Sequence, residues 1–202
     1  MSNGARRNSM AKIDVGARTD LYPLPTALVS CDDGFGRCSI ITISWTGICN
    51  SNPPMLSIAV QKKRYSHDII LQSGKFGLNL PNSDQVSQMD FCGNNSGRDY
   101  DKYKTCGFTK VRGDKNDTLL IEECPVSMEC AVKHVLGLGT HDLFIAEILS
   151  TYIDESVMDD EKRYVVEKLQ PIAYLTKARE YRGGFTEKLG KYGQYKDHFK
   201  NG

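Results

Sequence analysis

The feature that most constrains the fold is a two-residue alternation between residues 126 and 136. Every second residue of this stretch falls on one face, which carries Val126, Met128, Cys130, Val132, His134 and Leu136. A period of two over this length predicts a half-buried β-strand, with His134 as a core residue. The Gly-Leu-Gly sequence at 137–139 predicts a turn, and residues 142–153 predict a partner strand. A long antiparallel hairpin is therefore expected to organise the fold.

The other apolar segments are short and end at turn residues. They predict further strands at 26–31, 38–46, 55–61, 76–80 and 171–175. Short helices are predicted at about 67–73 with Ser66 as N-cap, near 84–91 with Ser83 as N-cap, and at 99–106. These strands and helices do not alternate, which argues against a doubly wound parallel sheet. The pattern favours a mainly β fold, a closed or nearly closed antiparallel β-barrel with short helices.

The composition is that of a globular protein with no strong overall charge. The chain has 202 residues, of which 40% are hydrophobic and 25% charged, and its formal net charge is +1. This balance argues against nucleic acid or an anionic membrane surface as a partner. No apolar run approaches the roughly 18 residues of a membrane span. The first ten residues lack the apolar region of a signal peptide, so a cytoplasmic location is expected.

Three segments are expected along the chain. Residues 1–20 are interpreted as a weakly ordered leader, 21–176 as one β-barrel domain, and 177–202 as a basic C-terminal extension. The extension holds seven Lys or Arg against three Asp or Glu. It either covers the barrel or a dimer seam, or it meets an acidic partner protein.

The cysteines predict neither a metal centre nor a disulfide. Seven are present, which is an odd number, and no CxxC spacing occurs. Structural zinc sites and dithiol redox motifs need close, patterned ligands. We expect free thiols, several of them small core residues, as is usual in a reducing compartment.

A row of hydroxyl groups is the first candidate for ligand binding. Thr42, Ser44 and Thr46 alternate with apolar residues and precede Gly47. Such a row beside a bend can hydrogen-bond the edge of a planar polar ligand. Hydroxyl residues are also common on a solvent-facing strand, and the spacing alone does not separate these two interpretations.

A basic segment and a histidine turn are the second and third candidates. Residues 62–67 (KKRYSH) place three cations before an expected helix start, where free N–H groups and the helix dipole attract phosphate. The alternative is a solvated charged loop. His141 follows a glycine turn and could donate a hydrogen bond or transfer a proton, or could simply occupy a surface turn. The GxGxxG, GxxxxGK[ST] and GxSxG motifs are absent.

Together and in this order, these segments resemble the flavin reductase-like, FMN-binding split-barrel family, and within it the flavoredoxin-like branch. The likeness covers roughly residues 21–190. The matching stretches are PLPTALVSC at 23–31, ITISWTG at 41–47, SNPPMLSIAVQKKRYSHDII at 51–70, GKFGLNLP at 74–81, DFCGNNSGRDYDKY at 90–103, IEECPVSMEC at 121–130 and LGTHDLFIAEI at 138–148.

The resemblance implies a homodimer of six-stranded antiparallel split barrels, with FMN rather than FAD held without covalent attachment near the subunit interface. The implied cofactor-binding residues are Thr42, Ser44, Trp45, Thr46, Gly47, Asn50, Ser51, Lys63, Arg64, Tyr65, Ser66 and His67. Residues 42–47 would line the isoalloxazine and residues 63–67 would hold the phosphate. His141 would lie beside the flavin or the incoming donor as the candidate catalytic residue. The 92–100 loop would shape the pocket mouth, with the partner subunit as one source of that loop.

Three functions remain open from the sequence. The chain is interpreted as an oxidoreductase that moves electrons from NAD(P)H through FMN, because the flavin itself carries the redox chemistry. Alternatively it is a flavoredoxin-type electron carrier reduced by a redox protein partner, or a flavin-binding protein without catalysis.

Overall fold

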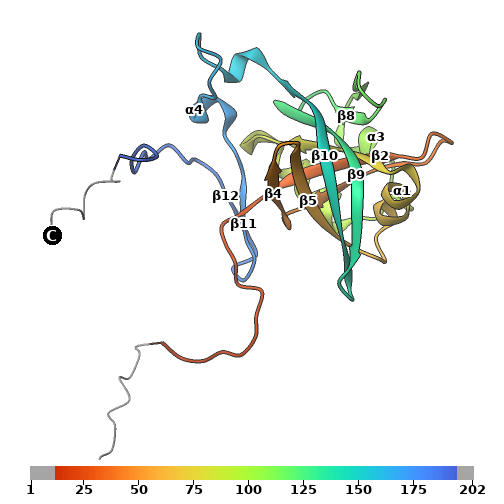
Figure 1. Ribbon diagram of the computed structural model, residues 1–202, viewed down its shortest axis with the longest axis horizontal. Helices are drawn as coiled ribbons and strands as arrows, with labels where there is room; N and C mark the ends of the chain where they lie inside the picture. The colour runs from red at the N-terminus through yellow and green to blue at the C-terminus, as the bar shows by residue number, and fades with distance from the viewer. Residues whose placement is uncertain (1–11, 195–202) are drawn as a thin grey trace, which may run out of the picture.

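The computed structural model describes residues 12–194, which form a mainly β molecule (Figure 1). The strands are β1 (Leu24–Pro25), β2 (Ala27–Asp32), β3 (Cys38–Ile43), β4 (Thr46–Ser51), β5 (Pro54–Gln61), β6 (Lys75–Leu80), β7 (Lys110–Arg112), β8 (Leu119–Ile121), β9 (Val126–Gly137), β10 (His141–Ile153), β11 (Ala173–Leu175) and β12 (Glu180–Arg182). The helices are α1 (Tyr65–Ser73), α2 (Val86–Asn94), α3 (Lys102–Cys106) and α4 (Val166–Leu169), with 3-10 turns η1 (Ser83–Gln85) and η2 (Glu155–Val157).

One antiparallel sheet of seven strands, ordered β3-β2-β6-β9-β10-β5-β4, forms the body of the molecule. Its two outermost strands, β3 and β4, are consecutive in the chain and are separated only by Ser44 and Trp45. The sheet is therefore rolled on itself as a split barrel, which confirms the predicted fold class. It has one strand more than the predicted six, because the single strand expected at 38–46 bends at Ser44.

The long hairpin is confirmed. Strand β9 pairs with β10 along its whole length, from Val126 opposite Ile153 to Gly137 opposite Asp142. The other neighbour of β9, strand β6, pairs with it only as far as Ala131. Beyond that point β9 has a single neighbouring strand, and residues 133–140 are exposed. The prediction of His134 as a core residue was wrong for this reason.

Two apolar clusters lie on opposite faces of the sheet. Inside the barrel, side chains such as Val29, Phe76 and Phe144 pack with Ile69 and Ile70 of α1. Outside it, a second cluster packs α2, α3 and β8 against the outer face, and includes Leu28, Ile40, Met89, Tyr103 and Ile121. All six residues of β2 are buried because this strand is covered on both faces.

The helix starts differ from the prediction, whereas two predicted helix ends are confirmed. Arg64, in extended conformation and without a side-chain cap, precedes α1, so Ser66 lies inside the first turn and was wrongly predicted as the N-cap. Asn82, not Ser83, caps η1 ahead of α2, with its side chain accepting a hydrogen bond from the Asp84 amide. Gly74 and Gly107 end α1 and α3 in left-handed conformation, with φ of 66° and 71°.

A small second sheet, ordered β1-β11-β12, lies beside the barrel (Figure 1). The boundary predicted at 176/177 separates β11 from β12, which pair with each other. The described chain ends run outward from the barrel in Figure 1. The first eleven residues of the predicted leader and residues 195–202 of the predicted extension lie outside the described residues. Within residues 12–194, no helix is long and apolar enough to cross a membrane.

Candidate functional site

Two cavities meet beside β3. The first, here called the basic cavity, has a volume of about 190 Å³ and contains Ser39, Lys63, Arg64, Ser66, Asn95, Ser96, Gly97, Arg98 and Lys102. The second, here called the aromatic cavity, has a volume of about 350 Å³ and contains Thr42, Ser44, Trp45, Gln61, His141, Tyr174 and Tyr181. Ile41 and Arg64 line both cavities. A single ligand could therefore extend from one cavity into the other.

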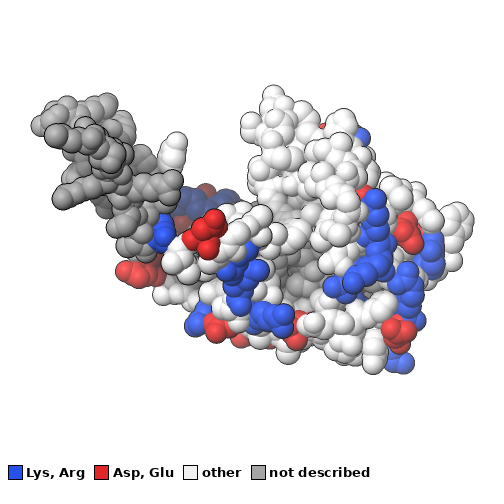
Figure 2. Space-filling model, turned by 90° about the horizontal axis from the view of Figure 1, so that it is seen from below, with Lys and Arg blue, Asp and Glu red and all other residues white. Residues whose placement is uncertain are grey.

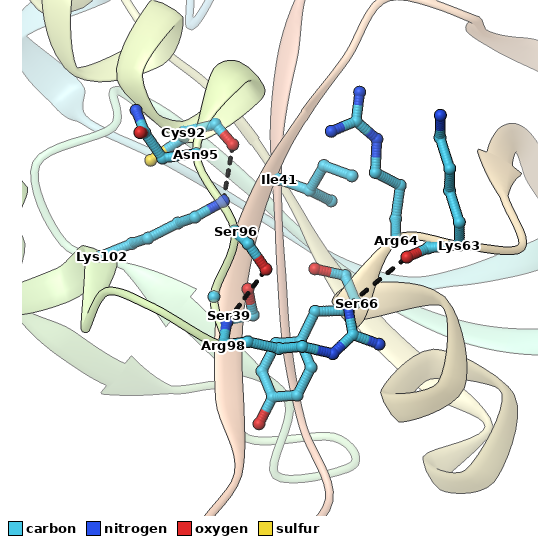
Figure 3. Close-up of a pocket in the computed structure, with 12 residues that line it drawn as sticks. Ser39, Ile41, Lys63, Arg64, Ser66, Cys92, Asn95, Ser96, Arg98 and Lys102 are labelled. Atoms are coloured by element: carbon cyan, nitrogen blue, oxygen red, sulfur yellow. Dashed lines mark hydrogen bonds between the residues drawn. The ribbon is translucent and has the colours of Figure 1, made fainter.

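Several chain segments build the basic cavity (Figure 3). Ser39 comes from β3, and residues 63–66 span the β5–α1 connection and the first residues of α1. Residues 95–98 come from the loop between α2 and α3, and Lys102 comes from α3. Residues of the 92–100 loop, which was expected to shape the pocket mouth, line this cavity within the chain itself. The Lys63 carbonyl oxygen accepts a 3.5 Å hydrogen bond from Arg98 Nη1, which joins the two loops.

The basic cavity concentrates positive charge that has no acidic partner. Among the described residues, no carboxylate lies within ion-pair distance of Lys63, Arg64, Arg98 or Lys102. The Arg98 guanidinium lies over the Tyr65 ring at 5.2 Å from its centroid. Figure 2 shows Lys and Arg side chains on both sides of a hollow in one face of the molecule. Unpaired cations beside serine hydroxyls are the donor set that binds a phosphate group.

Gly97 allows the α2–α3 loop to approach β3 and α1 closely. A Cβ atom at this position would lie 2.4 Å from Ser39 Oγ and 2.7 Å from Tyr65 Cδ1. Any other residue would push the loop away or displace these neighbours. The absence of a side chain at Gly97 therefore keeps the cavity walls together.

One wall of the aromatic cavity is formed by Trp45 and His141, whose ring centroids are 4.7 Å apart. Thr140 Oγ1 lies 2.9 Å from His141 Nδ1. Burial and the nearby positive charge of Arg64 lower the pKa of His141 below its ordinary value. The imidazole is therefore neutral at neutral pH, and it offers one ring nitrogen that Thr140 does not occupy.

Another wall comes from the small sheet. Tyr174 and Tyr181 lie with ring centroids 5.4 Å apart, and the Tyr181 hydroxyl donates a 2.9 Å hydrogen bond to Asp90 of α2. Burial and this carboxylate raise the pKa of Tyr181. Strand β12 is thus anchored to α2 and contributes directly to the aromatic cavity.

The structure brings most of the predicted site residues together, with some changes of role. Thr42 and Ser44 line the aromatic cavity, but the Thr42 hydroxyl donates to the Met89 carbonyl and helps to hold α2 on β3. Thr46 and Gly47 lie beyond the bend, on a groove of about 510 Å³ that also contains Leu21, Leu24, Ile48 and Leu143 and shares Ser44 and Trp45 with the aromatic cavity. The row of hydroxyls expected at 42–46 therefore spans two adjoining surfaces, with Ser44 on both.

His67, Asn50 and Ser51 do not line either cavity. The buried His67 ring has Nε2 at 2.8 Å from Asp142 Oδ2 and packs edge-on against Phe144. These contacts give His67 a structural role between α1 and β10. Asn50 and Ser51 lie exposed at the end of β4, where the Asn50 side chain donates to the Pro53 carbonyl. All three predicted cofactor contacts thus lie outside the lining of the basic and aromatic cavities.

Sequence reasoning missed several cavity residues, notably Ser39, Lys102, Tyr174 and Tyr181. The 95–98 loop was expected to shape the pocket because of its place in the family pattern. Lys102 and Tyr181 carry no such local signal, because a lysine in a short helix and a tyrosine in a basic tail are usually solvated. Within residues 12–194, no group of three potential metal ligands is found, and all seven cysteines are free.

Comparisons with known proteins agree on the family. Residues 19–183 match the model of the flavin reductase like domain. The flavoredoxin of Desulfovibrio vulgaris (Miyazaki F) is similar, with 32% identity and a TM-score of 0.84 over 91% of this chain and 98% of that chain. The flavoredoxin from Methanosarcina acetivorans has 26% identity and a TM-score of 0.86, covering 94% and 100%. An FMN-binding protein from Thermus thermophilus shares the fold, with 20% identity and a TM-score of 0.76 over 92% and 99%.

Proposed function

Because the chain belongs to the flavin reductase-like family, we propose that it is a redox flavoprotein that binds FMN without covalent attachment. The observation that carries the proposal is the junction of the two cavities at Arg64 and Ile41. A cluster of unpaired cations suits a phosphate group, and the adjoining aromatic walls suit a planar ring. FMN has these two parts joined by a short polar chain.

The donor chemistry of each cavity fits one part of FMN. Ser66, Arg98 and Lys102 would hold the phosphate, while Trp45 and His141 would border the ring. Only glycine at position 97 allows the α2–α3 loop to lie this close to Ser39 and Tyr65, and this close contact keeps the basic cavity narrow. Bound FMN supplies the hydride and electron-transfer chemistry. The chain itself supplies charge for binding, rings that exclude water, and a neutral imidazole able to donate or accept a proton at its unoccupied nitrogen.

We further propose that the electron donor is NAD(P)H, which would make the protein an oxidoreductase. The family supports this proposal, and so does the open volume of the aromatic cavity beside His141. Anaerobic addition of NADH or NADPH to the FMN-loaded protein is expected to bleach the visible flavin absorbance. Free FMN at the same concentration is the control, since it reacts slowly without a protein that positions the donor.

The second candidate is an electron carrier reduced by a protein partner. The 32% identity with a flavoredoxin over almost its whole length favours it. If neither nicotinamide bleaches the flavin but a reduced redox protein does, the carrier function replaces the reductase function. Truncation after β12 would then test whether the basic tail takes part in docking, because a docking tail would be needed for fast reduction at low salt.

We also propose a homodimer located in the cytoplasm. Strand β4 is an edge of the large sheet, and five of its six residues are exposed. An exposed edge strand offers unpaired backbone groups to a second copy of the same chain. All seven cysteines are free thiols, as is usual in a reducing compartment.

A further inference from the structure

Two cysteine thiols lie side by side where α2 and α3 meet. Cys92 is in the last turn of α2 and Cys106 is the last residue of α3. They are 14 positions apart in the chain, and their sulfur atoms are 3.7 Å apart. Cys106 Sγ also lies 4.0 Å from the carbonyl oxygen of Gln88, one helical turn before Cys92. The Cys106 thiol is therefore held against the face of α2 that carries Cys92.

The two sulfur atoms are close enough to form a disulfide after a small shift. A disulfide bond is about 2.05 Å long, so the sulfur atoms need to approach by less than about 2 Å. The loop that leads into α3 can follow such a shift, because residues 98–101 are exposed. Within residues 12–194, no other two thiols share a hydrogen-bond contact. The geometry therefore singles out this pair among the seven cysteines.

The burial of the two thiols decides which one an oxidant meets first. Cys92 is buried and Cys106 is half-buried. Burial raises the pKa of Cys92 to about 12 and also raises the pKa of Cys106. The hydrogen bond with Cys92 partly offsets this rise at Cys106. Both thiols thus stay protonated and free under reducing conditions, and Cys106 is the first to ionise and react.

A cross-link between these thiols would enclose a functional loop. Residues 95–101, between α2 and α3, lie wholly inside the ring that the disulfide would close, and residues 95–98 line the basic cavity. Cys92 lines the same cavity, and its carbonyl oxygen accepts a 2.7 Å hydrogen bond from Lys102 Nζ (Figure 3). The disulfide would therefore fix one wall of the basic cavity at both of its ends.

We propose that Cys92 and Cys106 form a reversible disulfide in the presence of hydrogen peroxide, and that this bond fixes the α2–α3 loop. The Cys106 thiolate attacks a peroxide oxygen, which gives a sulfenic acid and hydroxide. Cys92 then attacks the Cys106 sulfur, the S–S bond forms and a second hydroxide leaves. The two thiol protons convert both hydroxides to water, and two electrons pass from the thiols to the peroxide. The inference does not depend on which ligand the cavity holds.

The disulfide is tested by peptide mapping. The folded protein is treated with hydrogen peroxide until the exposed Cys49 is oxidised, quenched with acid, alkylated in denaturant and digested with trypsin. Trypsin places Cys92 in peptide 76–98 and Cys106 in peptide 105–110. The two peptides should be found joined, and dithiothreitol should separate them. The proposal is overturned if both cysteines remain alkylated, or if Cys92 is joined to Cys124 of the same apolar cluster.

The effect on the loop is measured on the same samples. Oxidation should raise the melting temperature on the order of 5–10 °C, because the cross-link removes chain entropy from the unfolded state. Hydrogen exchange of the amides in residues 95–101 should slow by at least about threefold, because local opening of the loop is restricted.

Cys106→Ala should lose the linked peptide and both effects. Cys49→Ser is the matched control, since this exposed thiol lies on β4, and it should keep them. The same shifts in Cys106→Ala, or a disulfide that leaves loop exchange unchanged, would overturn the proposal. Should Cys106→Ala not fold, reduction of the oxidised Cys49→Ser protein decides. Dithiothreitol should reverse both effects together with the link, and effects that persist after reduction would refute the proposal.

Discussion

At the scale of single residues, the charges around the two cavities divide into those with a partner inside the fold and those without one. Lys63, Arg64 and Arg98 have no carboxylate partner among the described residues, which suits them to an external anion. Asp142 belongs to the other group, with Oδ2 at 2.8 Å from His67 Nε2 and Oδ1 at 3.3 Å from Lys62 Nζ. These contacts hold the β5–α1 connection against β10, and so position the cavity side chains that follow Lys62.

Asp142→Asn is expected to lower stability in a pH-dependent way. The hydrogen bond from His67 and the charge of Lys62 lower the pKa of Asp142 in the folded protein. Its stabilising effect is therefore complete above the unfolded carboxyl pKa, about 4, and is lost as the pH falls through the lower folded pKa. Melting temperatures between pH 3 and 8 should show a constant deficit near neutrality that disappears in acid. Asp99→Asn, on the exposed loop, is the control, and a deficit that grows in acid would contradict this account.

Sequence reasoning found the residues whose role is indicated by the residues next to them in the chain. Arg64, Ser66 and His141 each belong to a short recognisable segment. Lys102 and Tyr181 could not be found in this way, because their environments come from residues 62 and 91 positions away, Ile40 and Asp90. The burial of a single polar side chain depends on such distant neighbours, and a periodic pattern does not contain them.

At the scale of elements, the pattern predicted strands well wherever one face is buried, as in β9 and β10. It failed at the bend between β3 and β4, because alternation continues through Ser44 and Trp45 while the pairing partner changes. Strand β3 pairs with β2, whereas β4 pairs with β5. Alternation shows which face of a strand each side chain is on, but it does not show which other strand pairs with it. The short strands β7 and β8 were missed, since three residues do not establish a period.

The contact between β9, β10 and the 114–116 loop leads to a prediction about Tyr152. Its hydroxyl donates a 2.6 Å hydrogen bond to Oε1 of the buried Glu129. The Glu129 carboxylate also accepts hydrogen bonds from the Lys115 and Asn116 backbone amides. Burial raises the pKa of Glu129, but these hydrogen bonds outweigh it and lower the pKa overall. Tyr152→Phe should reduce the free energy of unfolding by about 2 kcal/mol, the typical contribution of a hydrogen bond to a charged group.

Urea denaturation measures this loss. Tyr164→Phe is the matched control, because that side chain is 46% exposed and should be replaced with little effect. Equal stability of the two variants would show that the Glu129 network does not depend on Tyr152.

At the scale of the whole molecule, the groove beside β4 leads to a prediction about assembly. Ile48 is 70% exposed on this edge strand, next to the groove lined by Trp45 and Leu143. Pairing of two copies along β4 would cover this apolar surface. Sedimentation velocity should show a dimer for wild type and a monomer for Ile48→Lys, because a buried unpaired charge opposes association. Phe35→Lys, at a 95% exposed position in the β2–β3 turn, should remain dimeric. A monomeric wild type at micromolar concentration would contradict the assembly.

The most direct test of the central claim compares FMN with riboflavin in the wild-type protein. The two ligands share the ring and differ in the phosphate, so their affinity ratio reports on the basic cavity alone. A fluorescence titration of flavin-free protein should show FMN bound at least about tenfold more tightly, as charge-assisted hydrogen bonds to a phosphate would give. A well-folded protein that binds neither flavin, or binds both equally, would contradict the proposal that the joined cavities hold FMN.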